Sequence, residues 1–119
     1  MKVLHIVQNK FAEGSNVKRL GLEVLKDITP LTYGTCCWDF STDEANSLIG
    51  GLILLHDTKN LPSFIGGVVK EVVSVTLSGG PSRTKRIKFI FEAKLDCKDQ
   101  DWRGADHLMA WNSGILEVQ

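Results

Sequence analysis

Hydrophobic residues along this chain fall into short runs separated by glycine, proline and polar residues, a pattern typical of a small β-rich domain. The central stretch holds two of these runs. The first, Leu52 to Leu55, is continuous and suits a strand buried on both faces. The second, Phe64 to Val75, is rich in β-branched valine. Gly66 and Gly67 inside it indicate a bulge, a bend or the close approach of another backbone.

Further strands are predicted on both sides of this central pair. They share a high content of β-branched and aromatic residues, or an alternation of apolar and polar positions, which favours strands. The predicted strands are Met1 to Gln8, Leu31 to Phe40, Arg86 to Leu95 and Ile115 to Val118. The clearest of them is Arg86 to Leu95, in which Ile87, Phe89 and Phe91 face one way and Lys88, Ile90 and Glu92 the other.

Two helices are predicted in the first half of the chain. One begins at Ser15, keeps apolar residues at helical spacing and ends before Pro30. The other begins at Ser41, where Glu44 three residues later completes a capping box, and Gly50 ends it. The order of elements predicts an α+β fold or a partly open β-barrel of five to six strands with two or three short helices. A chain of 119 residues predicts a single domain, 1–119.

The charge balance argues against a broad electrostatic grip on duplex nucleic acid. Lys and Arg number 14, Asp and Glu also number 14, and the formal net charge is zero. A local basic run remains at Arg83, Lys85, Arg86 and Lys88. It predicts either a solvated strand face or a contact with nucleic acid.

Cysteine usage and hydropathy favour a cytoplasmic protein. The three cysteines include the adjacent pair Cys36 and Cys37, and an odd count of this kind is unlike a secreted disulfide framework. We therefore expect reduced thiols. No apolar run reaches the length of about 18 residues that a membrane span needs, so no membrane partner is expected.

Candidate ligand-binding groups are aromatic residues and the polar loop after Leu55. Flat indole faces stack on nucleobases, although core packing with the N–H satisfied by a carbonyl is the commoner role for any single tryptophan. In the loop, Lys59 could contact phosphate, and Thr58 or Ser63 could hydrogen-bond a ligand; the alternative is a solvated turn. The predicted ligand-binding residues are Trp38, Thr58, Lys59, Ser63, Arg86, Trp102 and Trp111.

The central stretch resembles PUA-like β-barrel domains, the superfamily that includes the ASCH and EVE families. The resemblance is carried by Gly51, the apolar run after it, the loop at Thr58 and Lys59, and the pair Gly66 and Gly67 before the valine-rich segment. It implies a PUA-like barrel that binds RNA or a modified base in DNA, with the base in a pocket rimmed by aromatic residues. A nucleoside-like small molecule is a second ligand class compatible with the neutral charge.

Two other function classes stay open. Some ASCH proteins act as amidohydrolases on modified nucleosides, and Lys59, Thr58 and Glu92 are the residue types that such a site uses, but their order does not match that pattern. An accessory protein that binds another protein is the third class. No catalytic set, metal site or cofactor is predicted, because the chain lacks CxxC, GxSxG, HExxH, P-loop and GxGxxG motifs. The chain is therefore predicted to be a non-enzymatic binding module.

Overall fold

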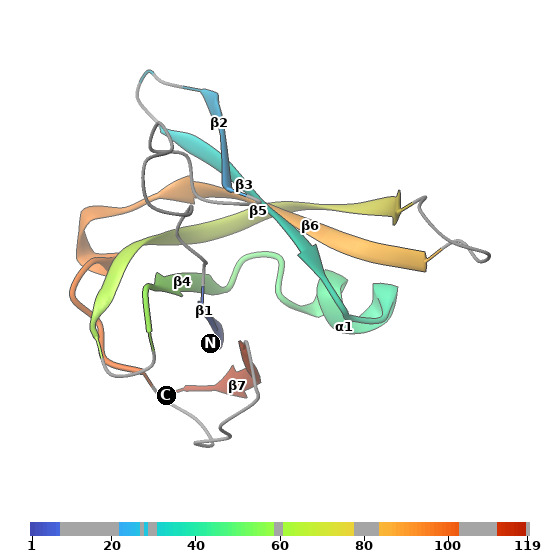
Figure 1. Ribbon diagram of the computed structural model, residues 1–119. Helices are drawn as coiled ribbons and strands as arrows, with labels where there is room; N and C mark the ends of the chain where they lie inside the picture. The colour runs from blue at the N-terminus through green and yellow to red at the C-terminus, as the bar shows by residue number, and fades with distance from the viewer. Residues whose placement is uncertain are drawn as a thin grey trace.

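The structure is a computed structural model that describes residues 1–7, 22–26, 28, 31–58, 61–77, 84–102 and 112–118. Its strands are β1 Lys2–Val7, β2 Leu22–Lys26, β3 Thr32–Trp38, β4 Leu52–His56, β5 Ser63–Leu77, β6 Thr84–Ala93 and β7 Asn112–Glu117. Its helical elements are α1 Thr42–Ser47 and the 3-10 turn η1 Leu95–Cys97. Within the described residues, the strands form one sheet in the order β2-β3-β6-β5-β4-β1-β7 (Figure 1).

The sheet is mixed and open. β1 pairs with β4 in parallel, and the other neighbours pair antiparallel, with β2 and β7 at the two edges. Figure 1 shows β5 and β6 crossing the molecule as a long pair, with α1 beside them. The predicted α+β class is confirmed in this coarse form. The described residues form seven strands and one α-helix, and their sheet does not close into a barrel.

The prediction of a helix that begins at Ser15 and ends before Pro30 is wrong for the part of this segment that the structure describes. Leu22–Lys26 is the edge strand β2, which pairs antiparallel with β3, while residues 8–21 lie outside the described part of the chain. Val24 lies opposite Tyr33 in this pairing. Helix propensity is a weak preference, and pairing with a neighbouring strand can override it.

The capping-box helix is confirmed. Ser41 Oγ accepts the backbone N–H of Glu44 at 3.1 Å, and the Glu44 carboxylate accepts the backbone N–H of Ser41 at 3.2 Å. Ala45 and Leu48 are the buried residues of this segment. The chain leaves the helix through Gly50, whose φ of +88° is strained for any other residue type. The helix is thus fixed by its cap and by two apolar contacts with the sheet.

The main core lies on one face of the sheet. It combines the inward side chains of the parallel strands β1 and β4 with those of β5, β6 and the α1 segment: Leu4, Ile6, Ala45, Leu48, Ile53, Leu55, Val69, Ile87, Phe89 and Phe91. The predicted alternation of β6 is confirmed, because its Ile87, Phe89 and Phe91 are all buried. Val3, Leu54 and Cys97 form a smaller cluster on the second face. β1 and β4 are therefore covered on both faces, as parallel strands usually are.

The glycine pair in β5 allows neighbouring backbones to approach closely. A Cβ atom on Gly67 would overlap the carbonyl of Glu92 on β6, and one on Gly66 would lie 2.5 Å from the Ile53 carbonyl oxygen on β4. β5 curves in its first half, where this pair lies (Figure 1). The predicted close backbone approach is confirmed, and it brings the start of β5 to the ends of β1 and β4.

The structure also bears on the state of the cysteines and on the presence of membrane-spanning helices. Cys97 is a free, buried thiol, but Cys36 is disulfide-bonded, so the expectation of reduced thiols is wrong for Cys36. Among the described residues, no helix has the length and hydropathy needed to cross a membrane.

Candidate functional site

Two buried histidines lie at the carboxyl ends of the parallel strands. In the β1–β4 register, His5 lies opposite Leu54 and Val7 opposite His56, so the two histidines are on the same face of the sheet. Both side chains are completely buried. His5 Nδ1 lies 2.8 Å from His56 Nε2, and His56 Nδ1 lies 2.9 Å from the Leu61 carbonyl oxygen. The sheet thus holds a continuous hydrogen-bonded chain from β1 to the loop after β4.

The environment of His56 favours the neutral ring. Burial lowers its pKa below the usual 6.5, against the upward effects of the Leu61 carbonyl hydrogen bond and then of the Asp101 and Asp57 carboxylates. The two carboxylates come from the ends of different segments that meet at this ring. At neutral pH the arrangement is therefore an uncharged histidine beside two nearby negative charges.

Trp102 packs against both histidines. Its ring centroid lies 5.4 Å from that of His5, with the planes tilted by 45°, and 5.2 Å from that of His56, in an edge contact of 70°. The residue is only partly buried. Aromatic contacts at these distances fix ring orientation. The indole is therefore braced from within the protein while part of the residue reaches the surface.

A cleft of about 290 Å³ lies on the same face of the sheet. Its floor is apolar and comes from neighbouring strands: Val3 of β1, Leu52 and Leu54 of β4, and Val68 of β5. The segment that follows β6 contributes Lys94, Asp96, Cys97 and Gln100. Leu54 lies two residues before His56 on the same strand face, so the histidine pair adjoins this floor, while Trp102 contacts the histidines without lining the cleft itself. An apolar floor with few polar groups is the usual composition of a ligand pocket.

Cys97 in the cleft wall is unsuited to act as a nucleophile. Burial raises the pKa of its thiol, and the Asp96 carboxylate raises it further through its charge and a hydrogen bond, against the opposing effect of Lys94. Because the thiolate is the reactive form, a raised pKa keeps this sulfur protonated at neutral pH. Cys97 therefore lines the cleft as a protonated thiol rather than as an activated nucleophile.

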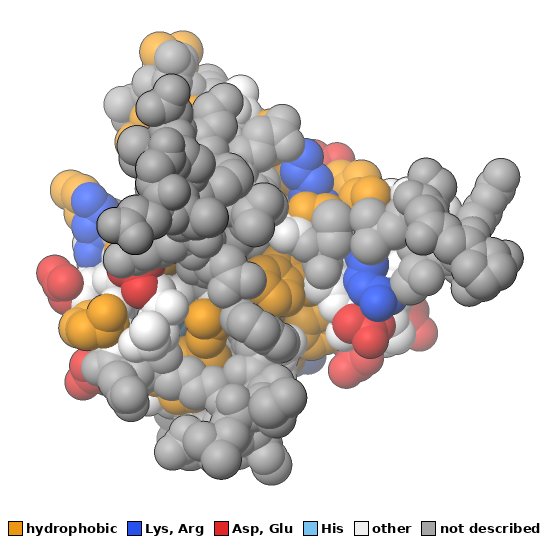
Figure 2. Space-filling view, viewed as in Figure 1, with side chains coloured by type: hydrophobic (Ala, Val, Ile, Leu, Met, Phe, Trp, Pro, Cys, Tyr) orange, Lys and Arg blue, Asp and Glu red, His pale blue; other side chains and the backbone are white. Residues whose placement is uncertain are grey.

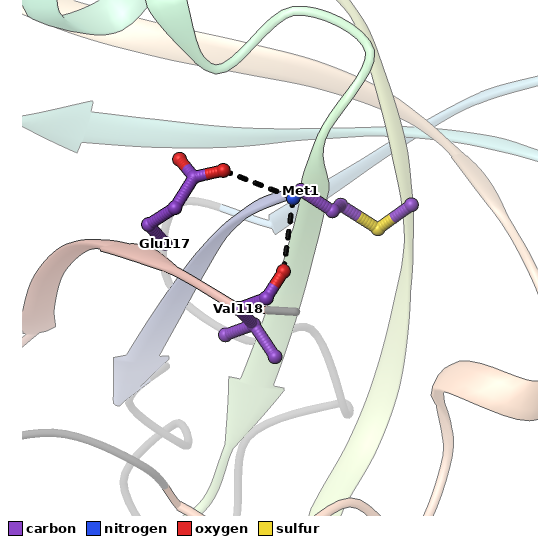
Figure 3. Close-up of polar contacts among 3 residues, drawn as sticks. All are labelled: Met1, Glu117 and Val118. Atoms are coloured by element: carbon purple, nitrogen blue, oxygen red, sulfur yellow. Dashed lines mark hydrogen bonds and ion pairs between the residues drawn. The ribbon is translucent and has the colours of Figure 1, made fainter.

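Met1 forms one end of the cleft and is held by the β7 end of the chain (Figure 3). Its ammonium group donates to Glu117 Oε1 at 3.0 Å and to the Val118 carbonyl oxygen at 2.9 Å. The ion pair is exposed, with 58% and 67% of the two side chains accessible, so its contribution to stability is small. Its structural effect is to position Met1 beside the apolar floor.

Three of the predicted site residues surround His56. Ser63 pairs with His56 across the β4–β5 hairpin, Thr58 follows His56 by two residues, and Trp102 contacts its ring. Thr58 is exposed, and its carbonyl accepts the Leu61 N–H at 3.2 Å. Ser63 is buried; its hydroxyl donates to the Cys97 carbonyl at 2.6 Å and accepts the Gln100 N–H at 3.0 Å. Ser63 thus fixes the segment that walls the cleft.

Trp38 and Arg86 lie together at another part of the sheet. Trp38 pairs with Ile87, the residue after Arg86, and Ile87 pairs with Ser74, which is eleven residues along β5 from Ser63. The indole N–H of Trp38 donates to Thr35 Oγ1 at 3.0 Å, and its ring packs on the main core. Arg86 lies 3.9 Å from the Asp39 carboxylate. Neither Trp38 nor Arg86 lines the cleft.

The candidate residues still to be placed are Lys59, Trp111 and Glu92. Lys59 and Trp111 lie outside the residues that the structure describes. Glu92, a candidate for amidohydrolase chemistry, pairs with Val68 on β5, and its carboxylate lies 3.9 Å from Lys70 Nζ. That pairing is five residues along β5 from Ser63, where the loop containing Thr58 returns to the sheet. The strand register therefore separates Glu92 from Thr58.

The surface charge is mixed rather than uniformly basic. Figure 2 shows acidic and basic side chains interspersed around the margin of one face, with hydrophobic side chains between them. No group of three or more His, Cys, Asp or Glu side chains within the described residues is arranged to hold a metal ion. The local chemistry of this site is that of a small apolar cleft, a braced indole and a buried histidine pair.

Sequence reasoning missed the histidine pair and most of the cleft. The usable signal was a histidine inside each of two apolar strand runs, LHIV and LILLH, because a titratable ring in such a run must be paired or strongly perturbed. Lys94 and Gln100 carried no comparable signal, since their roles depend on the turn of η1.

Comparison of the chain with protein-family models, curated proteins and solved structures finds no match.

Proposed function

We propose that this chain is a binding module for a nucleobase, presented in a short RNA or DNA strand or in a nucleoside. The base would lie in the cleft, with Trp102 beside it as a stacking surface. The observation that carries this proposal is that the apolar cleft floor and the histidine pair that contacts Trp102 lie on the same face of β1 and β4. A flat heterocycle matches an apolar floor, and its polar edge can meet the amide of Gln100 and the charged groups of Lys94 and Asp96.

The size of the cleft limits what it can hold. At about 290 Å³ it is at the lower end of the range for small-molecule sites, which favours one base over several. The balanced charge of the chain also favours a pocket for one base over a long electrostatic track. The PUA-like resemblance of the central stretch is in keeping with a base in RNA or a modified base in DNA.

The direct test is a binding titration with short single-stranded and duplex oligonucleotides, with and without modified bases, at low and moderate salt. We expect saturable quenching of tryptophan fluorescence by one class and a salt dependence that reports only a few phosphate contacts. Lys94→Ala should weaken binding, whereas Lys98→Ala, which removes the same charge from an exposed residue outside the cleft lining, should leave it nearly unchanged. Equal effects of the two substitutions would contradict a site in the cleft.

A further inference from the structure

The hydrogen bonds of the histidine pair define which ring atoms carry protons. The Leu61 carbonyl can only accept, so the His56 Nδ1 that faces it must donate. In a neutral ring, His56 Nε2 is then an acceptor, and the His5 Nδ1 that lies 2.8 Å away must donate to it. When both rings are neutral, both are therefore Nδ1–H tautomers, and His5 Nε2 is the basic atom of the pair.

The same geometry accepts one added proton but not two. A proton at His5 Nε2, a nitrogen that is shielded from solvent, leaves both hydrogen bonds intact, although burial opposes the added charge. The charge can pass to His56 if the proton between the rings moves from His5 Nδ1 to His56 Nε2. After a second proton is added, an N–H group on each ring points at the other across 2.8 Å, so the bond must break. Two groups coupled this strongly titrate as a pair in two macroscopic steps.

The pair supports the elements proposed to bind the ligand. Its far end holds the Leu61 carbonyl, which belongs to the loop that follows Thr58, and Trp102 packs against both rings. Burial lowers the pKa of His56 overall, and the carboxylates of Asp101 and Asp57, from the two adjoining segments, oppose that effect and favour the protonated ring. The strands β5 and β7, which flank the histidine pair, present serines to it: Ser63 of β5 pairs with His56, and Ser113 of β7 accepts the backbone N–H of His5. The charged neighbours named here are thus both acidic.

We infer that the His5–His56 pair is a one-proton site that couples ligand binding at Trp102 to pH; this coupling rests on the proposed function. Uptake of the first proton places an imidazolium against the indole ring and adds positive charge beneath an anionic ligand. Uptake of the second breaks the side-chain link between His5 and His56 and releases the support of Trp102 and of the Leu61 loop, while the backbone pairing of β1 with β4 remains. Affinity should therefore pass through a maximum as the pH falls.

The binding test uses an oligothymidylate without terminal phosphates, because neither its bases nor its diesters titrate between about pH 5 and about pH 8. We expect affinity to rise by about twofold to fivefold with the first proton, as for a cation–π contact, and to collapse with the second. His5→Asn keeps a donor at the Nδ1 position and removes one titrating group, so it should abolish the acid-side collapse. An affinity independent of pH, or an unchanged profile in the variant, would overturn the inference.

A second measurement on the unmodified protein separates this inference from the proposed function. Nitrogen-15 NMR of the imidazole rings near neutral pH should show both histidines as Nδ1–H tautomers, with the His5 signal identified by its loss in His5→Asn. An Nε2–H tautomer at either ring would overturn the relay even if oligothymidylate binds. Failure to bind at every pH would overturn the proposed function and the coupling, while the tautomers would still decide the state of the pair.

Discussion

His5 Nδ1 on β1 lies 2.8 Å from His56 Nε2 on β4, so the parallel pair of strands carries a completely buried polar contact between its side chains. Such a contact makes stability depend on pH. Burial lowers the pKa of His56 in the folded chain below its unfolded value of 6.5. Below that value the unfolded state binds more protons than the folded state, so stability is full above about pH 6.5 and is lost as the pH falls.

Urea unfolding at a series of pH values tests this expectation. The midpoint should decrease steadily from about pH 7 to about pH 5. His56→Asn keeps a donor for the Leu61 carbonyl but does not titrate, so the dependence on pH should become shallower even if the variant is less stable throughout. An equally steep dependence in the variant would show that other groups cause it.

Gly67 should tolerate no side chain. A Cβ at this position would overlap the backbone carbonyl of Glu92, which cannot move without disturbing the β5–β6 ladder. We expect Gly67→Ala to lower the free energy of unfolding by about 3 kcal/mol, the upper part of the range for overpacking. Thermal or urea unfolding measures it.

Gly34 provides the matched control for that substitution. Its added Cβ would meet mainly the end of the flexible Lys88 side chain, at 2.6 Å. Because that side chain can move, Gly34→Ala should change the free energy of unfolding by less than about 1 kcal/mol. Equal losses for the two alanine variants would contradict the close backbone packing assigned to the bend.

Ser63 should matter for stability through its hydroxyl. Ser63→Ala leaves the buried Cys97 carbonyl and Gln100 N–H without this partner, and we expect a loss of about 2 kcal/mol. Ser47→Ala removes a hydroxyl that donates to the Glu44 carbonyl at 2.6 Å on an exposed helix, where water replaces it, so little loss is expected. Chemical denaturation of both variants decides the comparison; a negligible loss for Ser63→Ala would refute its role in anchoring the cleft wall.

Local sequence signals predicted the parts of the fold that depend on local chemistry. The capping box at Ser41, the alternation of β6 and the glycine pair in β5 were all readable, because each follows from the needs of one element. The edge strand β2 was not, because pairing with β3 decides its conformation. The parallel pairing of β1 with β4 was also hidden, since it joins residues about fifty positions apart.

In the candidate site, too, residue type was predictable from the sequence, whereas contacts that depend on strand pairing were not. Trp102 could be proposed from its residue type, but its bracing by His5 and His56 required the register of two strands. Trp38 has the same residue type and a different environment, with its indole N–H bonded to Thr35 and its ring on the core. Composition alone gives both tryptophans equal weight. Only the packing distinguishes the stacking candidate from the core residue.

The most direct test of ligand binding beside Trp102 is to find which tryptophan reports the binding. Trp102→Phe and Trp38→Phe each remove one fluorophore, and the oligonucleotide titration is repeated with each variant after circular dichroism confirms folding. We expect the saturable quenching to disappear in Trp102→Phe and to persist in Trp38→Phe. Quenching that persists in Trp102→Phe and disappears in Trp38→Phe would place the ligand away from the cleft and contradict the account.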